Sequence, residues 1–153
     1  MGDLAVARVL HVLCVVLWIG GVAMVTLVLV PGVTGEPNGF KRFESIERRF
    51  ATQSKITVLL AGLSGFYIVW RLDLWARFAE LRFWWMHAMV AVWVIFAAVL
   101  FVLEPLLLHD WFRSRASRNP YKTMLLIQRL HWVLLALSLI TVAGAVAGSH
   151  GGF

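Results

Sequence analysis

The chain has 153 residues, of which 61% are hydrophobic and only 14% are charged. A soluble domain carries roughly a quarter charged residues and fewer apolar ones, so this composition excludes an ordinary soluble protein. It indicates an integral membrane protein of one domain, residues 1–153, whose main partner is the lipid bilayer. The net charge of +6 fits membrane orientation and contact with anionic lipid better than nucleic-acid binding.

Apolar runs predict four membrane-spanning helices, because about 20 residues are needed to cross ~30 Å of hydrocarbon. No small-residue cleavage site follows the first run, so that helix is expected to be retained. The second run is long enough only if its helix begins near Thr52, with Lys55 extending its amine to the interface. The predicted spans are residues 9–30, 52–72, 83–104 and 130–148. The predicted fold class is therefore all-α, an integral membrane four-helix antiparallel bundle.

Between the first two spans, apolar residues recur at helical spacing among basic ones: Phe40, Phe43, Ile46 and Phe50. This pattern predicts a short amphipathic helix lying on the inner leaflet. Small residues mark places where helix backbones approach closely, and Gly144 and Gly148 predict such a contact for the last helix. The run Phe83-Trp84-Trp85 is typical of an aromatic belt at the outer interface.

Lysine and arginine predict the orientation. Ten of the 14 basic residues follow the first and third spans, and cytoplasmic loops are the ones enriched in these residues. The ten are Lys41, Arg42, Arg48, Arg49, Lys55, Arg113, Arg115, Arg118, Lys122 and Arg129. Both termini are therefore expected in the periplasm, with the chain in the bacterial inner (cytoplasmic) membrane.

Histidines sort by depth in this topology. His11 lies about 4.5 Å below Arg8, and His87 about 7.5 Å below Arg82, at ~1.5 Å per residue. The two imidazoles therefore share a level in the outer leaflet, and His150 follows the last span on the same side of the membrane. His131 falls near the inner face. Ionisable groups inside membrane spans are functional by default, although a histidine can also simply bond a neighbouring helix.

Two histidines at one depth on different helices are what a b-type haem needs. His11 and His87 are the candidate iron ligands, and Cys14 and Trp18 share the stripe of His11, where they are expected to line the haem slot. The alternative and more common role for a cysteine such as Cys14 is that of a small buried hydrophobe. His150 would complete a three-histidine copper or zinc site with His11 and His87, and His131 is a weaker metal candidate.

An arginine pair and a glutamate each have both a structural and a functional interpretation. Arg48 and Arg49 are candidates to hold haem propionates, or else belong to the positive-inside cluster facing lipid. Glu104, before Pro105, is expected to pair with a loop arginine, with a proton relay as the alternative.

The stretch from Leu10 to Gly21, LHVLCVVLWIGG, resembles the first helix of small bacterial membrane proteins of the copper-resistance D (CopD) and HemJ groups. The matching residues are His11, Trp18, Gly20 and Gly21. The HemJ resemblance implies haem b and a link to protoporphyrinogen oxidation, and the CopD resemblance implies copper handling.

We therefore expect a haem b-binding membrane protein that carries electrons as an oxidoreductase or electron-transport component, reduced by a quinol or a porphyrinogen. Copper transport or resistance through the outer histidines is one alternative. A cofactor-free assembly or structural subunit is the other. A homo-oligomer or membership of a larger membrane complex fits each of these functions.

Overall fold

The computed structural model describes the backbone of residues 2–151 and their side chains except at 107–109. Every regular element in this part of the chain is a helix, which confirms the all-α prediction. The elements are α1 (Asp3–Met24), η1 (Val25–Leu29), α2 (Val30–Val33), α3 (Gly39–Arg71), η2 (Trp75–Ala79), η3 (Leu81–Phe83), α4 (Trp84–Ala98), η4 (Val99–Leu108), α5 (His109–Arg118) and α6 (Pro120–Ser149). Of the η segments, η1 and η4 are π-helical, and η2 and η3 are 3-10 helices.

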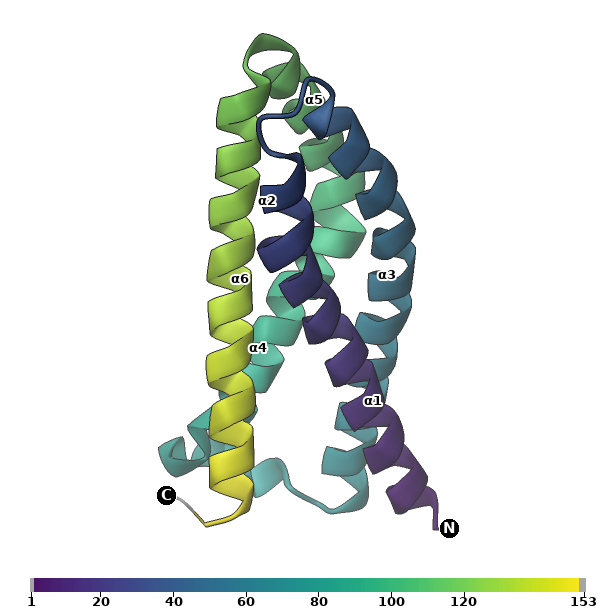
Figure 1. Ribbon diagram of the computed structural model, residues 1–153. Helices are drawn as coiled ribbons and strands as arrows, with labels where there is room; N and C mark the ends of the chain where they lie inside the picture. The colour runs from purple at the N-terminus through teal and green to yellow at the C-terminus, as the bar shows by residue number, and fades with distance from the viewer. Residues whose placement is uncertain (1, 152–153) are drawn as a thin grey trace.

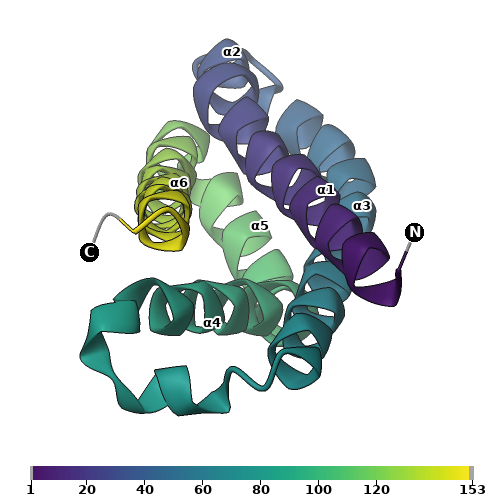
Figure 2. The same ribbon diagram turned by 90° about the horizontal axis from the view of Figure 1, so that it is seen from below.

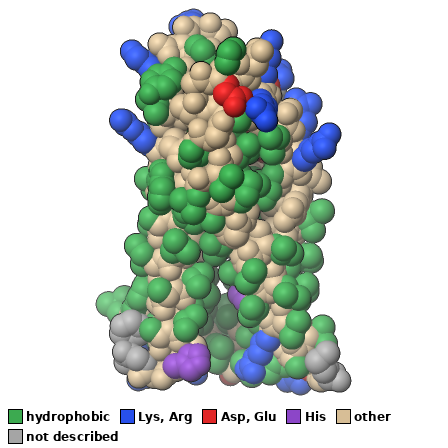
Figure 3. All heavy atoms as spheres, viewed as in Figure 1, with side chains coloured by type: hydrophobic (Ala, Val, Ile, Leu, Met, Phe, Trp, Pro, Cys, Tyr) green, Lys and Arg blue, Asp and Glu red, His purple; other side chains and the backbone are tan. Residues whose placement is uncertain are grey.

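Three helical stretches are long and apolar enough to cross a membrane, namely Asp3–Val33, Leu81–Leu106 and Pro120–Ser149. They contain three of the predicted spans, and α3 is not among them. Figure 3 shows charged side chains on this face near its two ends, with a band of mostly apolar surface between them. The chain is therefore a membrane protein with a lipid bilayer around its helices.

The long helices are arranged as two neighbouring pairs. α1 packs along α3, and α4 packs along α6. The chain leads away from the N-terminus in α1, returns in α3, leads away again through α4, and returns in α6 (Figure 1). The beginning of α1 and the end of α6 therefore lie at the same end of the molecule, called here the terminal end. Figure 2 shows the two pairs from this end.

Buried apolar side chains form two clusters. The first joins α1, α3, α4 and α6 near their middle through Cys14, Trp18, Val22, Val58, Ala61, Val92, Phe96 and Leu135. The second lies toward the opposite end and contains Val25, Leu29, Val30, Val33, Phe43, Met124 and Ile127. Neither cluster includes a residue of α1 before Cys14. Toward the terminal end the surface is hollowed between the two pairs (Figure 3).

The prediction of a separate amphipathic helix on the inner leaflet is wrong. Its residues form the first part of α3, which continues as one helix to Arg71. Phe43 belongs to the second buried cluster, and Phe40 and Phe50 pack against it. Because protein, and not lipid, covers these aromatic side chains, the segment has no reason to turn into the membrane plane.

The close contact predicted for the last helix is confirmed. A Cβ at Gly144 would lie 2.3 Å from the ring of Trp84, and a Cβ at Gly148 would lie 2.5 Å from the ring of Trp85. The two glycines thus admit the indoles at the start of α4 into the surface of α6. They fix how α4 and α6 meet at the terminal end.

Candidate functional site

His11 projects from α1 onto a small-residue face of α3. Its Nδ1 lies 2.9 Å from the carbonyl oxygen of Ala61 and 3.2 Å from Oγ of Ser64. Gly65 completes this face, because a Cβ there would lie 3.0 Å from Cε1 of His11. The sequence provides the face by placing three small residues at i, i+3 and i+4, which share one side of a helix.

The partner of Nδ1 determines which ring nitrogen of His11 carries the proton. A carbonyl oxygen only accepts hydrogen bonds, so Nδ1 is the donor and the lone pair of neutral His11 is on Nε2. The Ser64 hydroxyl is itself a donor to the carbonyl of Leu60, at 2.6 Å. Nε2 makes no hydrogen bond with any described residue. His11 is half-buried, and its Nε2 is the atom left to bind a ligand.

Cys14 and Trp18 continue the stripe of His11 into the first cluster. Both are buried, at 4% and 5% exposure. The Trp18 ring meets Phe96 of α4 edge-on, with ring centroids 4.8 Å apart. Its Nε1 is buried without a hydrogen-bond partner among the described residues. These two side chains therefore belong to the packed core next to His11 on α1, and the indole retains an unused donor.

His87 faces the loop that precedes α4. Its Nε2 lies 2.9 Å from the carbonyl oxygen of Phe78, and its Nδ1 lies 3.3 Å from that of Phe83. The Phe78 ring also packs edge-on against the imidazole, at 5.5 Å between centroids. Both ring nitrogens of His87 thus face backbone carbonyl oxygens of η2 and η3, and the single N–H of the neutral imidazole donates to one of them, Nε2 having the shorter contact. No periodicity in the sequence predicted this contact, because it depends on the path of an irregular loop.

Two further histidines belong to the region of α6: His131 lies in its first half, and His150 directly follows its last residue. His131 Nδ1 lies 2.9 Å from the carbonyl oxygen of Ile127, and the imidazole meets Phe43 edge-on. His150 follows α6 at the terminal end, is exposed, and has Nδ1 2.8 Å from the carbonyl oxygen of Val146. The structure thus places His150 at the same end as His11, and His131 away from both.

Arg48 and Arg49 lie far from His11 along α3. Ala61, the partner of His11, is 12 residues beyond Arg49, which corresponds to about 18 Å of helix at ~1.5 Å per residue. Phe50 lies instead against Gly21 of α1, where a Cβ would be 2.0 Å from its ring. The structure therefore does not bring these arginines into the surroundings of His11.

A polar cluster between α3 and η4 was not identified from the sequence. Lys55 Nζ lies 3.0 Å from Oε2 of Glu104, so the expected arginine partner of Glu104 is wrong. Glu47 lies nearby: its burial, together with repulsion from Glu104, raises its pKa to about 7, against the opposing effect of Lys55. Glu104 is distant in sequence from Glu47 and Lys55 of α3, and no spacing rule connects it to them. Only the packing of η4 on α3 brings them together.

Among the described residues, no three or more His, Cys, Asp or Glu side chains are grouped so as to hold a metal ion. No family model, curated protein or solved structure matches this chain.

Proposed function

We propose that α3 also crosses the membrane, over about residues 52–72, so that the chain forms an antiparallel four-helix bundle. α1 leads away from the terminal end and α4 starts again near that end (Figure 1). If both cross the bilayer, the chain between them must return across it, and α3 makes this return. Exposed Ile56, Leu59 and Leu63 provide α3 with an apolar surface for lipid.

The orientation in this proposal follows from the basic residues. Ten of the 14 lysines and arginines precede residue 56 on α3 or follow η4, and the positive-inside rule assigns such segments to the cytoplasm. The terminal end then faces the periplasm of a bacterial cytoplasmic membrane. His11 belongs to the outer half of the bundle in this orientation.

The function proposed for the terminal end is binding of haem b, whose iron His11 would hold. The observation that carries this proposal is the hydrogen bond from His11 Nδ1 to the Ala61 carbonyl. Histidines that ligate a metal usually donate the other ring N–H to a carbonyl or carboxylate, which fixes the tautomer and the orientation of the ring. His11 has this arrangement, and its Nε2 is unused.

The surroundings of His11 fit such a group. Cys14 and Trp18 lie one and two turns beyond His11 on the same side of α1 and belong to a buried apolar cluster, which would give a bound haem an apolar neighbour. Haem iron, when bound, supplies reversible one-electron transfer. The carbonyl of Ala61 holds the His11 imidazole and sets which of its nitrogens carries the proton. The buried cluster that begins at Cys14 would exclude water on that side of the imidazole. A quinol or a porphyrinogen is the proposed electron donor.

His87 is the proposed second ligand, provided that its present contact with the backbone breaks. Its Nε2 now lies 2.9 Å from the Phe78 carbonyl oxygen. Ligation through Nε2 therefore requires this contact to break, because Nε2 must lose the proton that it donates to the carbonyl before its lone pair can bind a metal.

Copper binding is the second candidate, and the position of His150 favours it. His11 and His150 lie at the terminal end, and each engages only Nδ1 with a backbone carbonyl. Imidazole nitrogens are suitable ligands for copper. This candidate predicts metal binding without a haem spectrum.

The test is the absorption spectrum of the detergent-purified chain, with a pyridine haemochrome assay and metal analysis. His11→Asn is the decisive variant, because its amide can still donate to the Ala61 carbonyl but does not replace an imidazole on iron. We expect His11→Asn to abolish the Soret band, and His87→Ala to abolish it or reduce it severely. His131→Ala is the matched control and should leave the band largely intact.

Each other outcome has a definite meaning. A full Soret band in His11→Asn refutes ligation by His11. A colourless protein that binds copper through His11, His87 and His150 establishes the copper candidate. A protein that binds neither leaves His11 as a hydrogen bond between α1 and α3, as expected for an assembly or structural subunit.

A further inference from the structure

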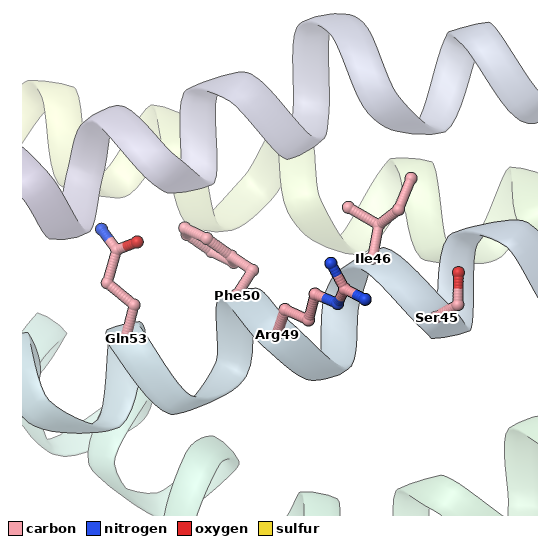
Figure 4. Close-up of a pocket in the computed structure, with 5 residues that line it drawn as sticks. All are labelled: Ser45, Ile46, Arg49, Phe50 and Gln53. Carbon is pink, nitrogen blue, oxygen red and sulfur yellow. The ribbon is translucent and has the colours of Figure 1, made fainter.

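A groove on α3 combines one unpaired arginine with polar and apolar side chains. It has a volume of about 510 Å³ and is lined by Ser45, Ile46, Arg49, Phe50 and Gln53. Figure 4 shows that all five residues come from successive turns of α3, and that Phe50 and Gln53 point toward the neighbouring helix. The groove lies far from His11, so its function is independent of the one proposed there.

Arg49 has no anionic partner within the described part of the chain. Of the two carboxylates that precede Arg49 on α3, Glu44 pairs with Arg113 at 2.6 Å, and Glu47 lies with Glu104 and Lys55. No acidic residue lines the groove. The five N–H donors of the guanidinium are therefore unused, and they match the oxygens of a phosphate group.

Gln53 and Ser45 extend the polar side of this groove. They lie one turn on either side of Arg49 and thus on the same face of α3. The Gln53 side chain makes no hydrogen bond with a described residue, so its amide N–H groups are available. Ser45 Oγ donates to the Arg42 carbonyl at 3.0 Å. Arg49 and Gln53 therefore present donors to an anion, whereas the single O–H of Ser45 is already used by the Arg42 carbonyl.

The apolar side of the groove is held in place by α1. The ring of Phe50 occupies the space left by Gly21, where a Cβ would be 2.0 Å from it. Further along the face of Arg49 and Gln53, the exposed residues are apolar, with Ile56 at 56% exposure and Leu63 at 60%. A ligand with a charged head group and a hydrocarbon tail would cover both the polar groove and the apolar surface beyond it on α3. A free anion would leave the apolar surface uncovered.

We propose that this groove binds an anionic phospholipid, with its phosphate on Arg49 and Gln53 and an acyl chain along the exposed apolar side of α3. The groove lies where α3 passes from charged to apolar residues, which is the level of lipid head groups in the proposed orientation. Anionic lipids are attracted to basic surfaces on this side of the membrane. Because Arg49 is the unpaired arginine that lines the groove, we expect the lipid phosphate to bind at this residue and not to the basic surface in general.

The experiment follows thermal unfolding of the full chain in neutral detergent while a lipid is titrated. The probes are dioctanoyl phosphatidylglycerol, the phosphatidylcholine of the same chain length, and inorganic phosphate. We expect phosphatidylglycerol alone to raise the melting temperature in a saturable way. Arg49→Gln should raise the half-saturating concentration roughly tenfold or more, because a hydrogen bond to a charged group typically contributes that much.

Arg48→Gln is the matched control, since it removes the same charge from the neighbouring residue, which does not line the groove. It should leave the half-saturating concentration nearly unchanged. Gln53→Ala provides a second variant should Arg49→Gln fold poorly, and it should weaken phosphatidylglycerol binding to a smaller extent. Equal weakening by Arg48→Gln and Arg49→Gln would show general electrostatic attraction and overturn the proposal. Equal stabilisation by phosphatidylcholine, or by inorganic phosphate, would overturn it as well.

Discussion

Substituting Gly62→Ala tests the packing of α4 against α3 at a single indole. Trp93 Nε1 donates to the Val58 carbonyl at 2.8 Å. In a helix this carbonyl is also the acceptor for the N–H of Gly62, four residues on. A Cβ on residue 62 would lie 2.4 Å from Nε1 and Cε2 of Trp93. The indole reaches α3 only because residue 62 has no side chain.

The magnitude follows from these distances. Non-bonded carbon atoms prefer ~3.5–4.0 Å, so the indole would have to move by about 1 Å. That movement stretches the hydrogen bond beyond its normal range, at a cost of about 0.5–1.5 kcal/mol. Overpacking adds about 1–3 kcal/mol, and the higher helix propensity of alanine offsets ~1 kcal/mol. We expect a net loss of about 1–3 kcal/mol in the free energy of unfolding.

The assay is thermal unfolding in detergent, monitored by tryptophan fluorescence. Phe66 packs edge-on against Trp93, with ring centroids 5.7 Å apart, and thus blocks one direction of escape. Gly20→Ala is the control, because a Cβ there meets nothing within 4 Å. It should change the stability by less than about 0.5 kcal/mol. If Gly62→Ala is as stable as this control, the close packing of Trp93 on α3 is refuted.

Three further predictions concern charge, packing and orientation. The pKa of Glu47, about 7, lies above its ordinary value of 4.5, so its contribution to stability is full below the ordinary value and is lost as the pH rises through about 7. Glu47→Gln should therefore flatten the fall in melting temperature between about pH 5 and about pH 8, and an unchanged slope would contradict this. Gly144→Leu should lower the melting temperature through overpacking of about 1–3 kcal/mol against Trp84, whereas an unchanged melt would mean that this face meets lipid. Alkaline phosphatase fused to the C-terminal end should be active, and an inactive enzyme with a fluorescent green fluorescent protein fusion would reverse the orientation.

The long helices could be predicted because each depends on local composition. A run of about 20 apolar residues forms a helix in a bilayer whatever surrounds it. The runs at 9–30, 83–104 and 130–148 accordingly fall inside the apolar helical stretches of the structure. Close helix contacts at Gly144 and Gly148 could also be predicted, since small residues on one face permit them. Their partners, Trp84 and Trp85, could not.

The orientations of the histidine side chains depend on more than depth. Rise per residue predicts the level of His11 and His87, but each imidazole turns toward the partner that its own helix face meets. His11 turns toward α3 because Ala61 and Ser64 offer oxygen atoms there. His87 turns toward η2, whose path no periodicity encodes. Rotation about the helix axis is set by the neighbouring helix, which the sequence does not identify.

Trp85 shows that the preference of tryptophan for the membrane interface predicts where a residue lies but not what it contacts. Tryptophan at a helix end is typical of the membrane interface, because its ring is apolar and its N–H is polar. Trp85 is only 7% exposed, and its ring lies where a side chain on Gly148 would have been. A glycine on one helix and an indole on another form a single packing unit, although neither residue predicts the other. The same pairing recurs between Gly62 and Trp93, so indoles seated on glycines hold α4 to both α3 and α6.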